Sequence, residues 1–408
     1  MPKCLICNSE IDPFMSFGKM PIANGFLTPD QFHNELFFKL MIGFCPKCTM
    51  VQLTELVERE KMFHENYAFY SSTSARMSQH FKEFAQHVRT DFLHSPDPFV
   101  VEIGSNDGIM LQHFAKDRVR HLGIEPSANV AKVAIEKNIN TISKFFDETL
   151  AKEIVTQYGQ ADAFLGANVM CHIPYMHSIL AGIKIILKPN GVVLFEDPYL
   201  GDIVTKTSYD QIYDEHAFYF SVSSVNYMFN QHEMEIFDIE PQNVHGGSMR
   251  YIIGHKGAHK ISVAVEHQKS IEKKLGLTKA ETYAKLKRNI EKSKDQLVNL
   301  LHDFRKRGKR IVGYGATSKS TTVTNYCGIT PELVEFISDT TPIKQGKYSP
   351  GVHIPVKHYD EFKNNYPDYA LLFAWNHGEE IIAKEQKFIE AGGKFVLYVP
   401  QVHISDRG

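Results

Sequence analysis

The chain has 408 residues, a formal net charge of −2 and 43% hydrophobic residues. This length predicts roughly two or three domains with full cores. The balanced charge and the lack of a long basic run argue against a nucleic-acid partner, and no apolar run is long enough to span a bilayer. We therefore expect a protein that acts on small molecules, binds neither nucleic acid nor membrane, and is a monomer or a weak homo-oligomer.

Four of the six cysteines form two CxxC pairs near the N-terminus, Cys4 with Cys7 and Cys45 with Cys48. Two residues between thiolates let one tight turn present both sulfurs to one ion, and the second pair completes a tetrahedral shell without an open position. The spacing predicts structural Zn²⁺, with iron as the competing metal. Disulfides or a redox pair are the alternatives. Disulfides need an oxidising compartment, whereas the first residues lack the apolar stretch of a signal peptide, so we expect a cytoplasmic protein.

Residues 1–66 predict a small zinc-binding module. This segment shows little helix periodicity and is rich in Pro, Gly and Phe. We expect the metal site to supply most of its core, and the module to fold only with metal.

Residues 67–255 predict an α/β core. Phe99–Ile103 is an apolar run that ends at Gly104, and a helical pattern follows at Met110–Phe114, which gives a strand, a glycine turn and a helix. Further strands are expected at 121–124, 163–166 and 191–195, each followed by a helical pattern. This alternation predicts a largely parallel, doubly wound, Rossmann-like sheet.

Residues 256–408 predict a second α/β domain. A long helix near 278–304 joins it to the core, with an expected capping box at Thr278 and Glu281 and apolar residues at helical spacing. Beyond Gly308, strands are expected at 310–315, 333–337, 369–373 and 394–398. The series predicts a second Rossmann-like domain that can bind a nucleotide.

The first turn of the core is the candidate cofactor site. Its glycines suit either a dinucleotide or S-adenosylmethionine, or a purely structural turn, and the glycine pattern alone does not decide. The acids in the turn make a poor cradle for a pyrophosphate but suit a cofactor with a cationic sulfonium and an ammonium group. An acid at the end of the second strand can accept hydrogen bonds from ribose hydroxyls of either cofactor class. The pattern resembles the S-adenosylmethionine motif of class I methyltransferases, with candidate ligands Glu102, Gly104, Asn106, Asp107, Gly108, Glu125 and Asn168.

Polar and aromatic residues follow the later strands of the core. His172 comes after the strand near 163–166, Tyr199 comes after the strand near 191–195, and Tyr213, Glu215 and His216 share the next loop. Next to a methyl donor, such residues offer a general base and hydroxyl donors. Any one of twenty histidines can be structural, but these two are expected at strand ends facing the donor. Glu215 can orient His216 or raise its basicity.

The four-cysteine module, the core with its Tyr213-Asp-Glu-His216 run, and the C-terminal turn Gly313–Lys319 together resemble the sugar C-methyltransferase family. The resemblance covers essentially the whole chain. It implies S-adenosylmethionine-dependent methylation at C-3 of a nucleotide-linked 4-keto-6-deoxysugar. In that chemistry the ketone acidifies the neighbouring C–H, a base removes the proton, and the enolate attacks the sulfonium methyl group.

The same resemblance implies roles for individual residues. It makes His216 the base, places Tyr213 and Glu215 beside it, and lets His172 hold or polarise the sugar oxygens. An aromatic segment after the zinc module supplies a further active-site tyrosine, with Tyr67 favoured over Tyr70.

The nucleotide-sugar partner, of dTDP or GDP type, is expected to contact both the core and the C-terminal domain. The family's substrate-facing loop matches the His-Gly-Gly sequence at 245–247, although such a turn can also simply join two strands. Arg250 can pair with a phosphate, and the turn at 313–319 feeds a helix N-terminus whose amides can meet a diphosphate. The substrate candidates are Tyr70, Tyr199, His245, Gly246, Arg250, Thr317, Lys319, Lys344, Trp375 and Asn376.

Three alternatives stay open at the level of sequence. An N- or O-methyltransferase on another small molecule would need no ketone. A zinc-knuckle RNA-binding or RNA-modifying protein is disfavoured by the balanced charge. A non-catalytic nucleotide-sugar binder is opposed by the cofactor acids and by the histidine run.

Overall fold

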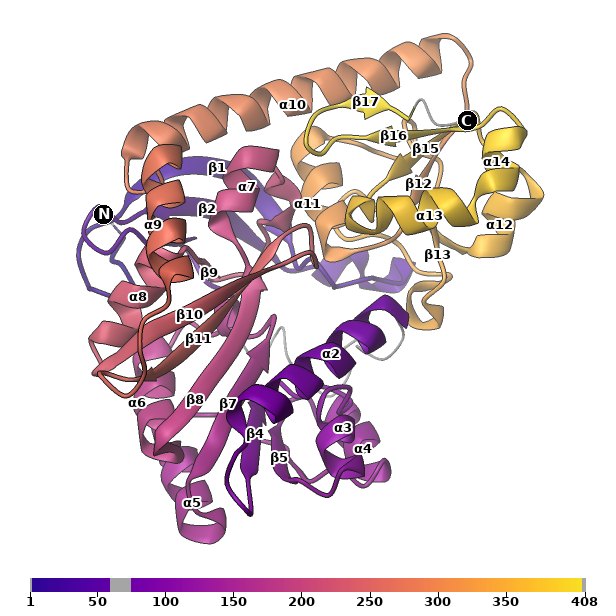
Figure 1. The fold of residues 1–408 in the computed structure, drawn as a ribbon. Helices are drawn as coiled ribbons and strands as arrows, with labels where there is room; N and C mark the ends of the chain where they lie inside the picture. Colours follow the sequence, from indigo (N-terminus) through magenta and orange to yellow (C-terminus); the bar gives the residue numbers. More distant parts are fainter. Residues whose placement is uncertain (1, 59–74, 406–408) are drawn as a thin grey trace.

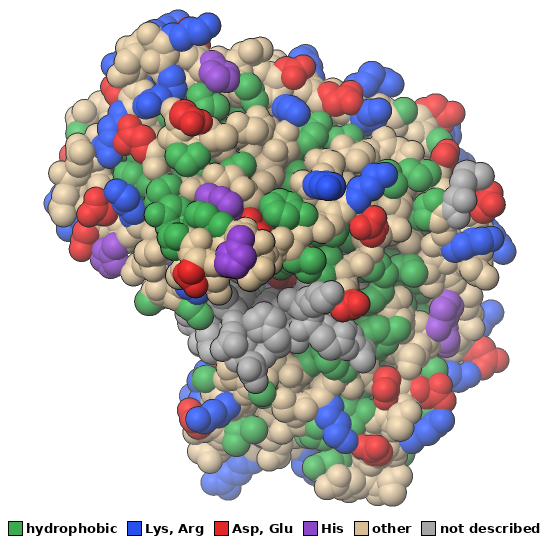
Figure 2. Space-filling view, turned by 180° about the vertical axis from the view of Figure 1, so that it is seen from behind, with side chains coloured by type: hydrophobic (Ala, Val, Ile, Leu, Met, Phe, Trp, Pro, Cys, Tyr) green, Lys and Arg blue, Asp and Glu red, His purple; other side chains and the backbone are tan. Residues whose placement is uncertain are grey.

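The computed structural model describes residues 2–58 and 75–405 and contains three sheets (Figure 1). The candidate active-site tyrosines Tyr67 and Tyr70 lie outside the described residues. Among the described helices, none combines the length and apolar character needed to cross a membrane. On the face seen in Figure 2, acidic and basic side chains are interspersed, without one broad basic patch.

The N-terminal sheet is antiparallel, in the order β1-β2-β3-β9. Its elements are β1 (Asp12–Pro21), η1 (Pro29–Asn34), β2 (Phe37–Phe44), β3 (Val51–Leu53) and β9 (Phe218–Tyr219). The strand β9 comes from the loop that follows His216, and it pairs Phe218 with Gln52. The zinc-binding module and the core are therefore joined by backbone hydrogen bonds directly beside the candidate base.

The prediction that the metal site supplies most of the N-terminal core is wrong. Alternate residues of the β1–β2 hairpin, such as Phe17 and Leu40, are buried in an apolar cluster shared with the C-terminal domain. The long helix α10 (Ala280–Lys306) contributes Tyr283 to the same cluster, and this ring contacts Phe14 and Phe44. The apolar face of the hairpin packs against a segment that is distant in the chain, so the sequence pattern shows that the face is buried but not what covers it.

The central sheet has seven strands, in the order β10-β11-β8-β7-β4-β5-β6. Strands β8, β7, β4, β5 and β6 are parallel, and β10 and β11 add an antiparallel edge. The strands are β4 (Phe99–Ile103), β5 (Arg120–Ile124), β6 (Thr141–Ile142), β7 (Ala161–Ala167), β8 (Leu187–Pro198), β10 (Met234–Gln242) and β11 (Ser248–His255). The helical elements are α2 (Ala75–Phe92), α3 (Leu111–Lys116), α4 (Ala128–Glu136), α5 (Glu148–Tyr158), η3 (Met170–His172), α6 (Met176–Ile186), α7 (Leu200–Lys206), η4 (Tyr209–Gln211) and α8 (Val222–Asn230). The predicted strands of the core are confirmed, and the parallel arrangement brings their carboxyl ends to one edge.

The C-terminal sheet has six strands, in the order β14-β13-β12-β15-β16-β17, and only β17 is antiparallel. The strands are β12 (Ile311–Tyr314), β13 (Ile337–Asp339), β14 (Val356–His358), β15 (Tyr369–Leu372), β16 (Lys394–Leu397) and β17 (His403–Ile404). The helices are α11 (Ser318–Cys327), η5 (Pro342–Lys344), α12 (Tyr359–Asn364), η6 (Trp375–His377), α13 (Gly378–Lys384) and α14 (Gln386–Glu390). The preceding helix α9 (Val263–Leu275) instead packs on the core, against α8 and β10. This confirms a second α/β domain.

Two sequence predictions in the C-terminal part need correction. The long helix begins after Lys279, without a side-chain cap, so the predicted capping box at Thr278 and Glu281 does not form. The strand expected at 333–337 begins only at Ile337, because Leu333 lies in a buried turn closed onto Thr330. A short apolar run does not distinguish a buried turn from a strand. In Figure 1 the helix α10 lies across the top of the view, from the N-terminal sheet to the C-terminal sheet.

Candidate active site

The four N-terminal cysteines lie together and fit a tetrahedral zinc ion. Their sulfur atoms all lie within 4.8 Å of one another, with Sγ–Sγ distances of 3.4 Å for Cys4–Cys48 and for Cys7–Cys45. Zn–S bonds of about 2.3 Å place tetrahedral sulfurs at about this spacing. Each pair sits in the same kind of turn, because the amides of Asn8 and Thr49 donate to the carbonyls of Cys4 and Cys45. The two turns form the knuckles predicted from the spacing.

A cavity opens at the carboxyl ends of the central strands. Its walls come from the ends of β4, β5 and β7, from α2 and from the loop before β11. The sequence candidates that line it are Gly104, Asn106, Glu125, Asn168, His172 and His245. The lining that sequence reasoning did not single out includes Met77, Phe81, Lys144, Phe146 and Tyr175. Cofactor candidates and reaction candidates thus share one cavity, as expected for parallel strands.

The turn after β4 is held by Glu125. Its two carboxylate oxygens accept hydrogen bonds from the amides of Asn106 at 3.0 Å and Ser127 at 2.8 Å. Gly104 has a φ of +62°, and a Cβ there would come within 2.5 Å of the Val169 side chain. Glycine is therefore required at this position by backbone conformation and by packing against the β7 loop.

The remaining acids of the motif lie behind the cavity wall. Burial, followed by the charges of Glu125 and Asp107, raises the pKa of Glu102 well above its ordinary value. Asp107 is buried and interacts with Lys137, while Gly108 packs against Ile139. None of Glu102, Asp107 and Gly108 lines the cavity. A cationic cofactor fits this neighbourhood, because it would offset the repulsion among buried carboxylates.

His216 is buried, and its ring orientation is fixed by the backbone. The ring nitrogen Nδ1 lies 2.7 Å from the carbonyl oxygen of Gln211, which can only accept, so Nδ1 carries the proton. Nε2 is then the basic nitrogen, and it is buried without a hydrogen-bond partner. The expectation that Glu215 orients this ring is wrong, because the Gln211 carbonyl does so.

Two further rings stand against His216. His172 stacks on it with ring centroids 5.1 Å apart, and the Tyr213 ring centroid lies 4.1 Å away. Burial lowers the pKa of His172 to about 4 and, with the neighbouring His172, lowers the pKa of His216 well below its ordinary value. Both imidazoles are therefore neutral near pH 7, which is the form that accepts a proton.

Glu215 lies in the same buried run, next to His216 in the chain. Burial, then the charge of Asp214, raises the pKa of Glu215 to about 8, although the hydrogen bond from Asn24 and the charge of Lys344 act in the other direction. Asn24 Nδ2 donates to Glu215 Oε1 at 2.6 Å. A carboxyl group in this state is protonated near pH 7 and can donate a hydrogen bond.

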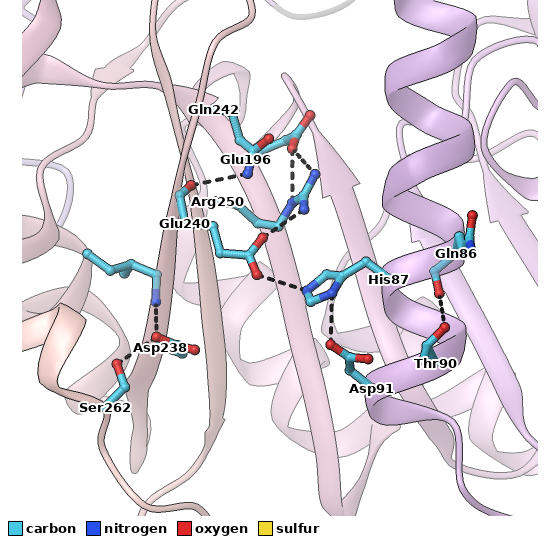
Figure 3. A network of polar contacts seen from close by, with 11 residues as sticks. Gln86, His87, Thr90, Asp91, Glu196, Asp238, Glu240, Gln242, Arg250 and Ser262 are labelled. Atoms are coloured by element: carbon cyan, nitrogen blue, oxygen red, sulfur yellow. Dashed lines mark hydrogen bonds and ion pairs between the residues drawn. The ribbon is translucent and has the colours of Figure 1, made fainter.

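Two substrate candidates have other roles. Arg250 is buried on β11, where its guanidinium donates to Glu196 and Glu240 (Figure 3). The guanidinium also covers the Phe84 ring. It is an internal ion-pair residue in this structure rather than a phosphate ligand. Tyr199 is also buried, and its hydroxyl donates to Glu272 on α9 at 3.0 Å. The hydroxyl is thus committed to helix packing rather than to a sugar.

The loop at 245–247 packs against the C-terminal domain. A Cβ at Gly246 would come within 2.4 Å of the Trp375 ring, and the indole nitrogen of Trp375 donates to Asp210 at 2.5 Å. His245 lines the cavity, and burial lowers its pKa to about 3. The Asn376 backbone carbonyl faces Arg76 of α2. The loop therefore lies where the core, α2 and the C-terminal domain meet.

The C-terminal glycine turn is partly occupied by its own side chains. Asp339 at the end of β13 accepts from the amide of Ala316 at 2.7 Å, and Thr317 caps α11 by accepting from the amide of Ser320. Burial lowers the pKa of Lys319, while the charge of Asp210 opposes that shift. Lys344 donates to the carbonyl of Ala316 at 2.8 Å. The charge of Lys319 acts on His245 and the charge of Lys344 acts on Glu215, so both lysines lie near candidate site residues.

Sequence reasoning missed several residues that the fold brings to the site. His80 on α2 contacts Glu196, and Cys171 lies within 4.8 Å of His172 and His216 with Asp197 beside it. Two more such residues are Asn24, which contacts Glu215, and Asp210, which contacts Trp375. No local signal marks His80, Asn24 and Asp210, since each meets its partner across more than 100 positions of the chain.

Known protein families match the N-terminal module, the core and the C-terminal domain of this chain. Family models match a zinc binding domain over residues 4–63, a methyltransferase domain over residues 62–237 and a C-methyltransferase C-terminal domain over residues 243–400. The C-methyltransferase NovU of Streptomyces niveus is 31% identical over 406 residues, which cover 98% of this chain and 96% of NovU.

Two similar solved structures each cover less than half of this chain. A SAM-dependent methyltransferase from Anabaena variabilis has 16% identity and a TM-score of 0.34, with 43% of this chain and 84% of that chain covered. Magnesium protoporphyrin IX methyltransferase from Synechocystis, with bound SAH, has 13% identity and a TM-score of 0.34, with 44% and 83% covered.

Proposed function

Because the chain belongs to the S-adenosylmethionine-dependent C-methyltransferase family, we propose that it methylates C-3 of a nucleotide-linked 4-keto-6-deoxysugar. One observation carries the proposal. His216 presents a neutral, basic Nε2 in a buried site next to the cavity that His172 lines. Carbon methylation needs such a base, because the carbon must lose a proton before it can attack a methyl group.

His216 Nε2 takes the proton from C-3 in this proposal. The Gln211 carbonyl keeps the other ring nitrogen protonated, so the ring becomes an imidazolium with no tautomer change. The adjacent C-4 ketone then carries enolate charge. S-Adenosylmethionine, when bound, supplies an electrophilic methyl group to the carbon.

The enolate oxygen requires hydrogen-bond donors in a site without bulk water. Glu215 is a suitable donor because its raised pKa keeps it protonated near neutral pH. The Tyr213 hydroxyl and a ring N–H of His172 are further candidate donors, since both rings pack against His216. These groups stabilise the enolate oxygen by hydrogen bonding, and methylation of the carbon regenerates the C-4 ketone, so the oxygen gains no proton overall.

The rest of the candidate set binds the two substrates. Gly104, Asn106, Glu125 and Asn168 line the cofactor part of the cavity, with Glu102, Asp107 and Gly108 behind them. For the nucleotide diphosphate, of dTDP or GDP type, we propose the groups at the junction with the C-terminal domain, namely His245, Gly246, Thr317, Lys319, Lys344, Trp375 and Asn376. Tyr67 or Tyr70 completes the sugar site in this proposal.

The test uses S-adenosylmethionine with a ¹³C-labelled methyl group and a panel of dTDP- and GDP-linked 4-keto-6-deoxysugars. A carbon-bound methyl group at C-3, identified by long-range ¹³C–¹H correlation, supports the proposal. A second measurement incubates enzyme, sugar and S-adenosylhomocysteine in D₂O, where deuterium should enter C-3 without methyl transfer. Label on oxygen or nitrogen, or methylation of ketone-free sugars at the same rate, would refute it.

A further inference from the structure

A tight turn of the zinc-binding module reaches the candidate catalytic run. The turn follows β1 and is closed by the amide of Gly25, which donates to the carbonyl of Ile22 at 3.0 Å. From this turn the Ala23 amide donates to Asp214 Oδ1 at 2.9 Å, and Asn24 Nδ2 donates to Glu215 Oε1 at 2.6 Å. Two consecutive residues of the module thus bind two consecutive buried acids, 191 positions away in the chain.

The C-terminal domain holds the same turn from the other side. On α11, the Thr321 hydroxyl donates to the carbonyl of Ala23 at 2.8 Å. The next residue, Thr322, donates to the carbonyl of Ile212 at 2.9 Å, just before Tyr213. The turn is therefore fixed between the catalytic run and α11, so Asn24 has little freedom to move away from Glu215.

We propose that Asn24 is a positioning residue that fixes the orientation of the Glu215 carboxyl group and the oxygen that carries its proton. The inference rests on the proposed function, since it concerns the donor to the enolate oxygen. The amide nitrogen can only donate, so Oε1 must accept from it. When Glu215 is protonated, its proton is then held on Oε2. Without Asn24, the proton can occupy either oxygen and the carboxyl group can turn.

The charges around Glu215 make this hydrogen bond measurable. The charges of Asp214, next to it in the chain, and of Lys344 in η5 both act on the Glu215 carboxyl group. The charge of Glu215 in turn raises the pKa of the buried Cys171. A hydrogen bond donated to a carboxylate favours the ionised form, so loss of Asn24 should raise the pKa of Glu215. The expected shift is about one pH unit, the size of one hydrogen bond to a charged group.

The experiment compares the wild-type enzyme with Asn24→Ala and Asn24→Asp. Asn34→Ala is the matched control, because Asn34 is an exposed asparagine of the same module. The titration of Glu215 is followed by NMR of ¹³Cδ-labelled glutamate in zinc-loaded protein, with Glu215→Gln to assign its signal. Methyl-transfer kcat, KM and their pH profiles are measured in parallel, together with zinc content.

In Asn24→Ala, kcat should fall about tenfold with KM for S-adenosylmethionine unchanged, and the alkaline limb of the kcat profile should move up with the Glu215 titration. Asn24→Asp should raise the Glu215 pKa further, because two adjacent carboxyl groups resist joint ionisation. Asn34→Ala should match the wild type. An unchanged Glu215 titration in zinc-loaded Asn24→Ala overturns the positioning role even if no variant shows turnover. By contrast, a shifted titration in a wild-type chain that never methylates carbon overturns only the proposed function.

Discussion

Replacing Arg250 by Met should destabilise the core much more than an ordinary ion-pair mutation does. Arg250 is 6% exposed and donates to Glu196 through Nε at 3.1 Å and through a terminal nitrogen at 2.9 Å. Another nitrogen donates to Glu240, and the guanidinium carbon lies 3.8 Å from the Phe84 ring centroid. Met keeps most of the apolar contact but leaves Glu196 buried with one cationic partner fewer.

The expected loss of stability follows from the burial of the Arg250–Glu196 pair. Removing one partner of a buried pair costs about 3–5 kcal/mol, because the other charge stays buried without compensation. The matched control is Arg120→Met, since Arg120 pairs with Asp97 and covers the Phe99 ring but is 42% exposed. Such an exposed pair contributes about 0–1 kcal/mol. The double variant Arg250→Met, Glu196→Gln should recover part of the loss, because residue 196 then carries no buried charge.

The effect should also depend on pH. Burial alone would raise the pKa of Glu196, but the contacts with His80 and Arg250 outweigh it and the net pKa is lowered. A lowered folded-state pKa contributes stability above the unfolded pKa of about 4.3, and this stability is lost as pH falls through the folded value. Without Arg250 the Glu196 pKa rises, so the stability difference between variant and wild type should be largest near pH 7 and smaller near pH 4.

The assay is hydrogen–deuterium exchange of peptides that contain β8 and β11, which gives the free energy of opening of this part of the sheet. Equal opening free energies for Arg250→Met and Arg120→Met would refute the reasoning. A loss that is the same at pH 4 and pH 7 would also refute the role given to Glu196. Figure 3 shows that His87 and Asp91 of α2 extend the network, so exchange in α2 should increase as well.

Three further predictions concern the site and the metal. His216→Ala should lower turnover by about 10²–10⁴-fold with normal S-adenosylmethionine binding, measured by calorimetry, and full activity would exclude His216 as the base. Chelation, or Cys45→Ser, should unfold the two cysteine turns and lower the thermal midpoint, whereas unchanged stability in zinc-free protein would contradict structural zinc. Gly104→Ala should weaken cofactor binding at least about tenfold, because its Cβ would overlap Val169. The control Gly328→Ala has a similar φ of +64° but open space around its Cβ, so it should cost only about 1–2 kcal/mol of stability and leave cofactor binding unchanged. Equal cofactor affinities in these two glycine variants would contradict the packing argument.

Much of the local structure could be predicted because its signals are local. The strand at Phe99–Ile103 has the bounds expected from its apolar run and the following glycine. Each CxxC pair forms its own turn from local sequence. The tertiary fold then only has to bring the two turns together. The cofactor motif is local for the same reason, since its strand, turn and helix are consecutive.

The contacts made by individual side chains were less predictable. Arg250 looked available for a phosphate, but its strand pairs with β8 and places it opposite Glu196. Tyr199 looked like a sugar contact, but α9 brings Glu272 to its hydroxyl. An arginine or a tyrosine in a sequence carries the same chemistry in either setting, and only the strand order and helix packing select its partner.

The sequence by itself indicated the three-part organisation, the four-cysteine cluster, the candidate cofactor turn and the histidine run, because each is encoded by residues close together in the chain. Only the tertiary structure decided which groups surround the candidate base. The Gln211 carbonyl fixes the His216 tautomer, and Asn24 reaches Glu215 from the zinc-binding module. These contacts depend on how remote segments pack together, and the pKa shifts depend on burial. The spacing of residues in the sequence specifies neither.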